Sequence, residues 1–377
     1  MRDYKLFILR FFLIAALSLA GLLCFNYSLD PNNRYQFHVS ESDLRLLAEV
    51  PGHALVVPSN YDDRIFLKRF IRVVSRPETV AMGGSRIMNL ENPTGQSALQ
   101  LNFLNAGVTA GTIKDYVAIW QILKQSKKIP KTIFLCVDPQ ALSRAVQNAL
   151  WLSLNDDYQA FFKTNDSGRY YLASLTSQIK DLLSLQTTLA SISQIGKKKV
   201  RPELLLTVQC NRLTPVRTAS FALLYPAAYE EKDPADVEAM ARAHGDGEVK
   251  AFKLWNRHDL EYLGQLKMLI ENMKKEGVQV VLVLMPYHPL SLQSIKQDAV
   301  ALNSLIFFRE QLSKISRECA VAYYDGFGDT EKGLFLNRDF SDGVHLKKDS
   351  NHIFFDRISQ AVRYSTAQSD VSTKERG

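Results

Sequence analysis

The sequence predicts an α/β fold: a three-layer α/β/α sandwich whose parallel central sheet is covered by helices on both faces. Short apolar segments alternate with segments of helical periodicity, both before residue 143 and after residue 256. The segment "TIFLCVD" at 132–138 is apolar almost throughout, which is typical of a central strand buried on both faces. With 46% hydrophobic residues, the 377-residue chain can bury a core of this size.

Residues 1–28 predict an N-terminal signal anchor that crosses a membrane as a transmembrane helix. Arg2, Lys5 and Arg10 precede or flank an apolar run that, counted from Leu6, is long enough to span a bilayer. No A-x-A cleavage pattern follows the run, although a cleaved signal peptide is the alternative. Because positive charges stay cytoplasmic, residues 29–377 are expected on the extracytoplasmic side.

The remaining elements are expected from periodicity and turn signals. A polar connection with a Pro-Asn-Asn turn, 28–36, leads into the α/β domain. A mainly helical insertion at about 143–256 interrupts the alternation, with Gly-, Pro- and charge-rich connections. The expected helices are 43–48, 62–74, 113–124, 260–275, 302–317 and 350–362. The expected strands are 79–82, 102–105, 132–138, 278–286 and 321–325.

Charge and cysteine content argue against nucleic-acid binding and against a metal site. The net charge of +7 is mild, and no zinc-finger spacing or RNA-binding signature occurs, so nucleic acid is not an expected partner. The clusters Lys127-Lys128 and Lys197–Lys199 with Arg201 are interpreted as solvated surface, with an anionic membrane or polymer as the alternative. No C-x-x-C pair occurs, so neither a metal nor another cofactor is expected. Cys24 and Cys136 are expected to be buried; a disulfide through Cys210 stays open.

Ser85 is the candidate nucleophile. It lies in "TVAMGGSRIMNL" at 79–90, where an apolar strand runs into a Gly-Gly-Ser turn. In parallel sheets the ligand crevice lies at the carboxyl ends of the strands, and Ser85, Asn105 and Asp138 all follow or end expected strands. The alternative is an ordinary polar residue at the end of a strand.

The partners of Ser85 are expected in "DFSDGVHLKKD", between the last strand and the last helix. Asp342 and His345 are three residues apart, so the carboxylate can reach the imidazole Nδ1 while Nε2 turns toward Ser85. A serine nucleophile needs such a base, and the base needs an orienting acid.

A second small-residue turn predicts an oxyanion hole. In "NFLNAGVTAGTIKDY", backbone N–H groups at Ala110 and Gly111 can face an oxyanion together with the amide of Ser85. A tight strand-to-helix turn with no further role is the alternative.

Four residues near these turns are predicted to bind substrate: Arg86, Asn105, Gly107 and His288. Arg86 follows the nucleophile and can bind an anionic group, or else form a salt bridge. His288 in "MPYHPL" follows a core strand and can line the cleft, or else serve packing or a turn. No G-x-S-x-G elbow, G-x-G-x-x-G or P-loop is present, which argues against α/β-hydrolase and nucleotide-binding folds.

The ordered motifs resemble the SGNH/GDSL hydrolase superfamily, from about Thr79 to Arg363. Ser85 matches the nucleophile of the first block, Ala110-Gly111 the oxyanion segment of the second, and Asp342 with His345 the last block. The anchor, "SLDPNNRY", "VDPQAL" and "MPYHP" look closest to the membrane-anchored extracytoplasmic branch, which includes DltD-like and AlgJ/AlgX-like proteins of bacterial envelopes.

The chain departs from the family pattern at three places. The first block is Gly-Gly-Ser-Arg, and Ala110 takes a slot usually held by glycine. Asp138 stands where the third block supplies an asparagine donor, with Gln140 as a possible substitute. One lost oxyanion donor costs about 10²–10³ in rate, which fits a slow enzyme or a transferase.

The resemblance implies a serine esterase or O-acyltransferase without cofactor or metal. It would act on acyl groups of a cell-envelope polysaccharide or polymer, in the periplasm and anchored in the bacterial inner membrane. The alternative is a catalytically silent anchor or adaptor that binds a glycan or recruits a membrane-bound O-acyltransferase.

Overall fold

The computed structural model describes residues 2–31, 35, 39–50, 52–58, 61–91, 102–143, 148, 150–163, 167–196, 203–205, 213–254 and 260–374. The basic cluster at 197–201, Cys210 and parts of the 28–36 connection lie outside the described residues.

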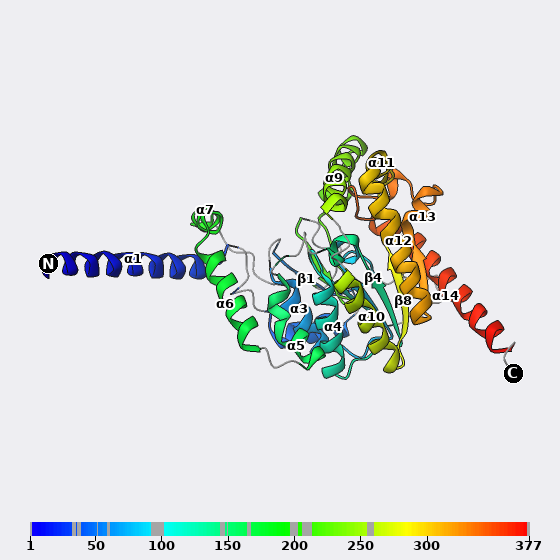
Figure 1. The fold of residues 1–377 in the computed structure, drawn as a ribbon, viewed down its shortest axis with the longest axis horizontal. Coiled ribbons are helices and arrows are strands. Elements are labelled where there is room, and N and C mark those ends of the chain that lie inside the picture. Colours follow the sequence, from blue (N-terminus) through cyan, green and yellow to red (C-terminus); the bar gives the residue numbers. More distant parts are fainter. Residues whose placement is uncertain are drawn as a thin grey trace.

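A five-stranded parallel sheet forms the centre of the fold, with strand order β3-β2-β4-β8-β9 (Figure 1). The strands are β2 (Thr79–Gly83), β3 (Phe103–Gly107), β4 (Thr132–Cys136), β8 (Gln279–Leu284) and β9 (Ala322–Asp325). Every neighbouring pair is parallel. These are the five strands expected from the sequence, so the predicted α/β fold with a parallel sheet is confirmed.

The two faces of this sheet pack against different helices, because successive strand residues point to opposite sides. Val80 and Ile133 belong to a core to which several helices contribute. Four of those helices are α3 (Asp63–Val73), α4 (Ile113–Gln125), α10 (Leu260–Lys275) and α12 (Ala299–Cys319). Ala81 and Phe134 belong to a second core, which α14 (Asn351–Lys374) closes through Phe354, Phe355 and Ile358. Both faces are therefore covered, as the apolar strand sequences require.

A second, smaller sheet is antiparallel and was not expected from the sequence. Its order is β5 (Glu203–Leu205), β1 (Ala54–Val56), β6 (Val216–Thr218) and β7 (Leu223–Leu224). Three of these strands lie in the 143–256 segment, which therefore contributes strands as well as helices. The segment also touches the main sheet, since Asn105 N–H donates to Ser220 O at 2.7 Å and Leu223 N–H to Met88 O at 2.6 Å.

The other helices surround these sheets. The 143–256 segment contains α5 (Asn155–Phe162), α6 (Ser167–Leu182), α7 (Leu185–Gln194), α8 (Ala227–Glu230) and α9 (Pro234–Leu254). Elsewhere lie α2 (Glu41–Glu49), α11 (Pro289–Gln297) and α13 (Gly326–Glu331). Helices α11 and α13 were not predicted from the sequence. Helices α9 and α11 lie side by side in Figure 1 and in contact.

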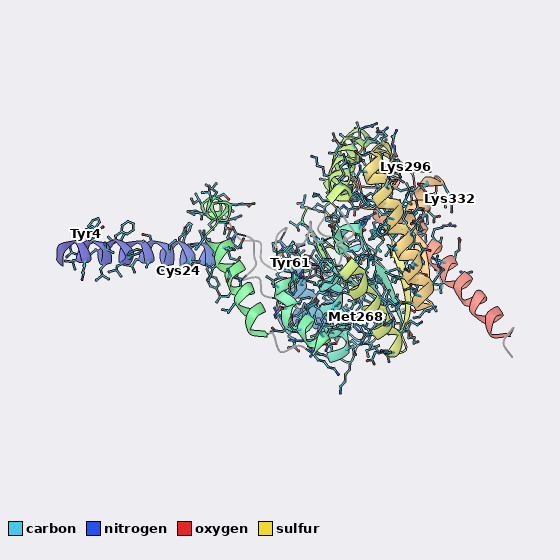
Figure 2. The ribbon with its side chains drawn as sticks, viewed as in Figure 1. Tyr4, Cys24, Tyr61, Met268, Lys296 and Lys332 are labelled. Carbon is cyan, nitrogen blue, oxygen red and sulfur yellow. The ribbon has the colours of Figure 1, made fainter. Side chains whose placement is uncertain are left out.

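Helix α1 (Arg2–Leu29) projects away from the rest of the chain (Figure 1). Its segment Tyr4–Leu29 is long and apolar enough to cross a membrane, judged by length and composition. Side chains such as Tyr4 radiate outward from it (Figure 2). Cys24 is exposed on this helix, contrary to the sequence expectation, because few elements pack around α1; Cys136 is buried as expected.

Candidate active site

Ser85 lies directly beyond the carboxyl end of β2. The strand ends at Gly83, Gly84 stays extended, and Ser85 opens a single 3₁₀ turn that ends at Ile87. A side chain at Gly83 would place its Cβ 2.9 Å from the carbonyl oxygen of Cys136, so only glycine lets the strand turn this close to β4.

The structure brings Ser85, His345 and Asp342 together in the order expected for a catalytic triad. His345 Nε2 lies 3.2 Å from Ser85 Oγ, and His345 Nδ1 lies 2.8 Å from Asp342 Oδ2. All three residues come from the positions at which the sequence placed them, on two loops that lie 260 residues apart in the chain. This arrangement lets the imidazole accept the serine proton while the carboxylate fixes its tautomer.

Asp342 is held in place by its own loop. Its Oδ1 accepts hydrogen bonds from the backbone N–H groups of Val344 and His345, both at 2.8 Å, and its Oδ2 also accepts from the Tyr229 hydroxyl. Burial raises the pKa of the Asp342 carboxyl, but the hydrogen bond and charge of His345, followed by Tyr229, outweigh it and hold that pKa well below its usual range. Asp342 is therefore an ionised hydrogen-bond acceptor.

Two aromatic side chains, Tyr225 and Tyr229, adjoin His345 and Asp342 and were not predicted from the sequence. Their ring centroids lie 4.6 Å apart, and the Tyr225 ring meets His345 edge-on at 6.4 Å. Burial, and then the charge of Asp342, raise the pKa of Tyr229 far above its ordinary value, so its hydroxyl stays a donor. In the sequence, the two tyrosines lie four residues apart in "LLYPAAYE". Nothing in that spacing indicates a contact with Asp342.

The predicted oxyanion turn lies beside Ser85. A Cβ at Gly111 would come within 3.0 Å of Gly83 O and 3.1 Å of Gly84 Cα, so β2 and the β3–α4 turn pack backbone to backbone. Among the described residues, neither the Ser85 amide nor the Gly111 amide donates a hydrogen bond. Ala110 adopts φ +47°, the left-handed region that favours glycine, which explains why glycine suits this slot.

Asp138 also borders this space. Its Oδ2 lies 3.3 Å from the point that a Cβ of Gly84 would occupy, and the Gly111 nitrogen lies 3.7 Å from that same point. The carboxylate supplies no N–H donor. Gln140 does not supply one either, because its amide donates to Glu248 Oε1 at 2.5 Å.

Arg86 is buried and neutralises Asp138. Its Nη1 lies 2.6 Å from Asp138 Oδ1, and its Nη2 donates to the carbonyls of Met285 and Pro286. The guanidinium also lies 3.9 Å from the ring centroid of Tyr287. With these partners Arg86 fits the salt-bridge interpretation, and it is not presented to a substrate.

Glu248 of α9 completes a buried polar cluster behind the site. Its Oε2 accepts a hydrogen bond from the Tyr287 hydroxyl at 2.9 Å, in addition to the bond from Gln140. Burial raises the pKa of Glu248 to about 7, although the charge of Arg86 opposes the shift. Another α9 residue, His244, packs against Gly343 of the Asp342 loop, so α9 supports the site from two sides.

Asn105 and Gly107 act inside the protein. The Asn105 amide nitrogen donates to the carbonyls of Ile87, Met88 and Leu90 at 2.5, 3.2 and 2.9 Å. Its Oδ1 accepts from Gly107 N–H at 2.9 Å, and the side chain is fully buried. The structure therefore does not support direct substrate contact; Asn105 instead secures the turn that carries Ser85.

His288 is likewise fully buried, which leaves it out of reach of a substrate. Its Nδ1 accepts the N–H of Leu290 and caps α11, while its backbone N–H donates to Gly343 O. Burial lowers its pKa from 6.5 to about 4, so the imidazole is neutral near pH 7. The packing and turn alternative describes its environment.

Comparisons with protein-family models, curated proteins and solved structures find no match.

Proposed function

We propose that this protein is a membrane-anchored serine hydrolase or acyltransferase of the SGNH type. The observation that carries the proposal is the continuous contact Ser85–His345–Asp342 at the carboxyl end of a parallel sheet. The cores on both faces of that sheet support a three-layer α/β/α arrangement. The apolar helix α1 supports an anchor. The basic residues Arg2, Lys5 and Arg10 favour a cytoplasmic N-terminus and therefore a periplasmic folded part.

The reaction uses Ser85 Oγ as the nucleophile. It attacks the carbonyl carbon of an ester while His345 Nε2 accepts the serine proton. The ionised Asp342 stabilises the imidazolium, and the amides of Ser85 and Gly111 donate to the oxyanion. The tetrahedral intermediate collapses, the bond to the leaving alkoxide breaks, and His345 returns the proton to it. An acyl-Ser85 intermediate remains.

The second half of the reaction decides between esterase and transferase. Water or a hydroxyl of an envelope glycan attacks the acyl-Ser85 carbonyl, while His345 again accepts the proton and later returns it to Ser85. Asp138 makes the oxyanion space less favourable for negative charge, partly offset by Arg86. That balance fits a slow hydrolase, or a transferase that needs a special acyl donor.

The test uses the full chain in detergent and an aryl acetate as substrate. Ser85→Ala should reduce hydrolysis to the uncatalysed background, whereas Ser313→Ala on α12 should leave it unchanged. Equal hydrolysis by wild type and Ser85→Ala would exclude Ser85 as the nucleophile.

A silent adaptor is the second candidate, favoured by the Asp138 carboxylate beside the oxyanion space. A fluorophosphonate probe separates the two functions, because it labels only an activated serine. Labelling of Ser85 that disappears in His345→Ala supports the enzyme. A folded wild-type protein that takes up no label supports the adaptor.

A further inference from the structure

Helix α7 (Leu185–Gln194) is amphipathic with its apolar face exposed. Leu185, Leu189 and Ile192 are 74%, 57% and 52% exposed. They lie at i, i+4 and i+7, so they form one stripe along the helix. The opposite face is polar and buried, since Thr187 is 3% and Ser191 0% exposed. This is the reverse of what a helix on a water-soluble domain normally presents.

One group of this polar face gains nothing from being buried. The Ser191 hydroxyl is buried and has no hydrogen-bond partner within the described part of the chain. Leaving three large aliphatic side chains in water while burying a hydroxyl in this way is unfavourable on both counts. The distribution is instead what a helix at a water–lipid boundary requires.

The position of α7 beside the end of α1 indicates that its exposed apolar face meets a membrane. In the last turn of α1, the buried Asn26 side chain donates to Leu182 O at 2.6 Å and to Thr188 Oγ1 at 3.0 Å. These bonds hold the α6–α7 connection and α7 against the end of the candidate span, and Figure 1 shows α7 there. If α1 crosses a bilayer, its end and the adjoining α7 lie at the level of the headgroups.

Two further features agree with a membrane surface. Helix α6 carries its own exposed stripe, formed by Leu172, Leu175 and Ile179 at i, i+3 and i+7. The sequence that follows Gly196 is basic, with Lys197–Lys199 and Arg201, and basic charge beside an interfacial helix favours anionic lipids.

We infer that α7 binds the surface of the anionic bilayer that α1 crosses, with Leu185, Leu189 and Ile192 inserted at the boundary between headgroups and acyl chains. The helix then forms a second membrane contact that fixes how the folded part stands on the membrane. The inference rests on the proposed anchor and is independent of any catalytic role of Ser85.

The test places one tryptophan reporter at a time in the full chain. The protein is reconstituted into vesicles of phosphatidylcholine and phosphatidylglycerol, brominated either near the glycerol end or near the methyl end of the acyl chains. The reporters are Leu189→Trp on α7, Leu17→Trp in the middle of α1, and the exposed Met268→Trp on α10, distant from α1 in Figure 2. Each signal is the difference from the parent protein.

The expected result is loss of Leu189→Trp fluorescence with bromine near the glycerol end, loss of Leu17→Trp fluorescence with bromine near the methyl end, and no loss for Met268→Trp. Quenching of Leu17→Trp without any quenching of Leu189→Trp would overturn the inference while leaving the anchor intact. Absence of quenching at both positions would overturn the anchor and the inference together.

Discussion

The Asp342 carboxylate receives hydrogen bonds from its own loop, from His345 and from Tyr229. These contacts keep its pKa well below its usual range, so it stays ionised through the neutral pH range. In Asp342→Asn the amide can present N–H to Nδ1 and favour the wrong imidazole tautomer. We expect kcat/KM for aryl acetate to fall by about 10³–10⁴, with the folded structure kept. A fall of less than tenfold would contradict an orienting role for Asp342.

Tyr229 is a positioning residue, because it touches Asp342 and not the reacting atoms. Tyr229→Phe removes one hydrogen bond to the carboxylate, which should raise the pKa of Asp342 and lower kcat/KM by about tenfold. The acid limb of the pH–rate profile should also move to higher pH, a change that a merely structural role does not produce.

Tyr323→Phe is the matched control, since the Tyr323 hydroxyl is buried without a hydrogen-bond partner among the described residues. It should leave both the rate and the pH profile unchanged. Equal profiles for wild type and Tyr229→Phe would remove Tyr229 from the site.

Ser85, Asp342 and His345 could be selected from the sequence because triad chemistry demands particular residue types at the ends of ordered elements. Tyr229 and Glu248 could not, because each reaches the site through the inserted segment, and no local pattern records that contact. Arg86, Asn105 and His288 were located correctly near the turns, but sequence spacing does not report that their side chains point inward.

At the scale of elements, the turn between β3 and α4 is held by its close approach to β2. Gly111→Ala would put a Cβ 3.0 Å from Gly83 O and 3.1 Å from Gly84 Cα, both backbone atoms, and 3.2 Å from the Tyr116 ring. We expect destabilisation by about 1–3 kcal/mol, typical of overpacking, together with loss of activity because the turn carrying Ser85 shifts. Urea unfolding and aryl acetate hydrolysis measure the two effects.

At Ala110, the residue before Gly111, the reverse substitution of alanine by glycine can be tested. Ala110 already has φ +47°, so Ala110→Gly should relieve strain and leave stability equal or about 0.5–1 kcal/mol higher. If Gly111→Ala were as stable and active as Ala110→Gly, the close approach of the two backbones would be refuted.

The strands of the main sheet were predictable because each spans four to six mostly apolar residues between clear turn signals. The strands of the small sheet span two or three residues each, too few for alternation to show. Their pairing of Val56 with Val216 across 160 residues depends on tertiary contacts alone. Because these short strands leave no alternation in the sequence, the 143–256 segment was expected to be mainly helical.

On the scale of the whole molecule, the parallel sheet brings the site together by gathering the carboxyl ends of its strands at one edge. The fold class and this edge follow from the alternation of elements. The inserted segment adds contacts to the site. Helix α9 places Glu248 near Asp138 and Arg86, and α8 places the Tyr229 hydroxyl on Asp342. Two buried titratable groups near this edge, Glu248 and His288, then give stability a defined dependence on pH.

Glu248 and His288 change the stability of the fold in opposite directions as pH rises. The pKa of Glu248 rises from 4.5 to about 7 on folding, so its contribution is fully present below pH 4.5 and is lost as pH rises to 7. The pKa of His288 falls from 6.5 to about 4, so its contribution is present above pH 6.5 and is lost as pH falls to 4. Each group changes the free energy of unfolding by about 3 kcal/mol across its pH range. Between pH 4.5 and 6.5 the two slopes should cancel.

Two variants separate these slopes. Glu248→Gln keeps an acceptor for Gln140 and a partner for Tyr287 but cannot ionise. Its stability relative to wild type should therefore increase from pH 4.5 to 7. His288→Asn keeps a helix cap but does not titrate, so its stability relative to wild type should decrease over pH 4–6.5. Urea unfolding of the full chain at half-unit pH steps measures both differences. A difference between wild type and Glu248→Gln that does not change with pH would mean that Glu248 is ionised in the folded protein, and that Arg86 outweighs its burial.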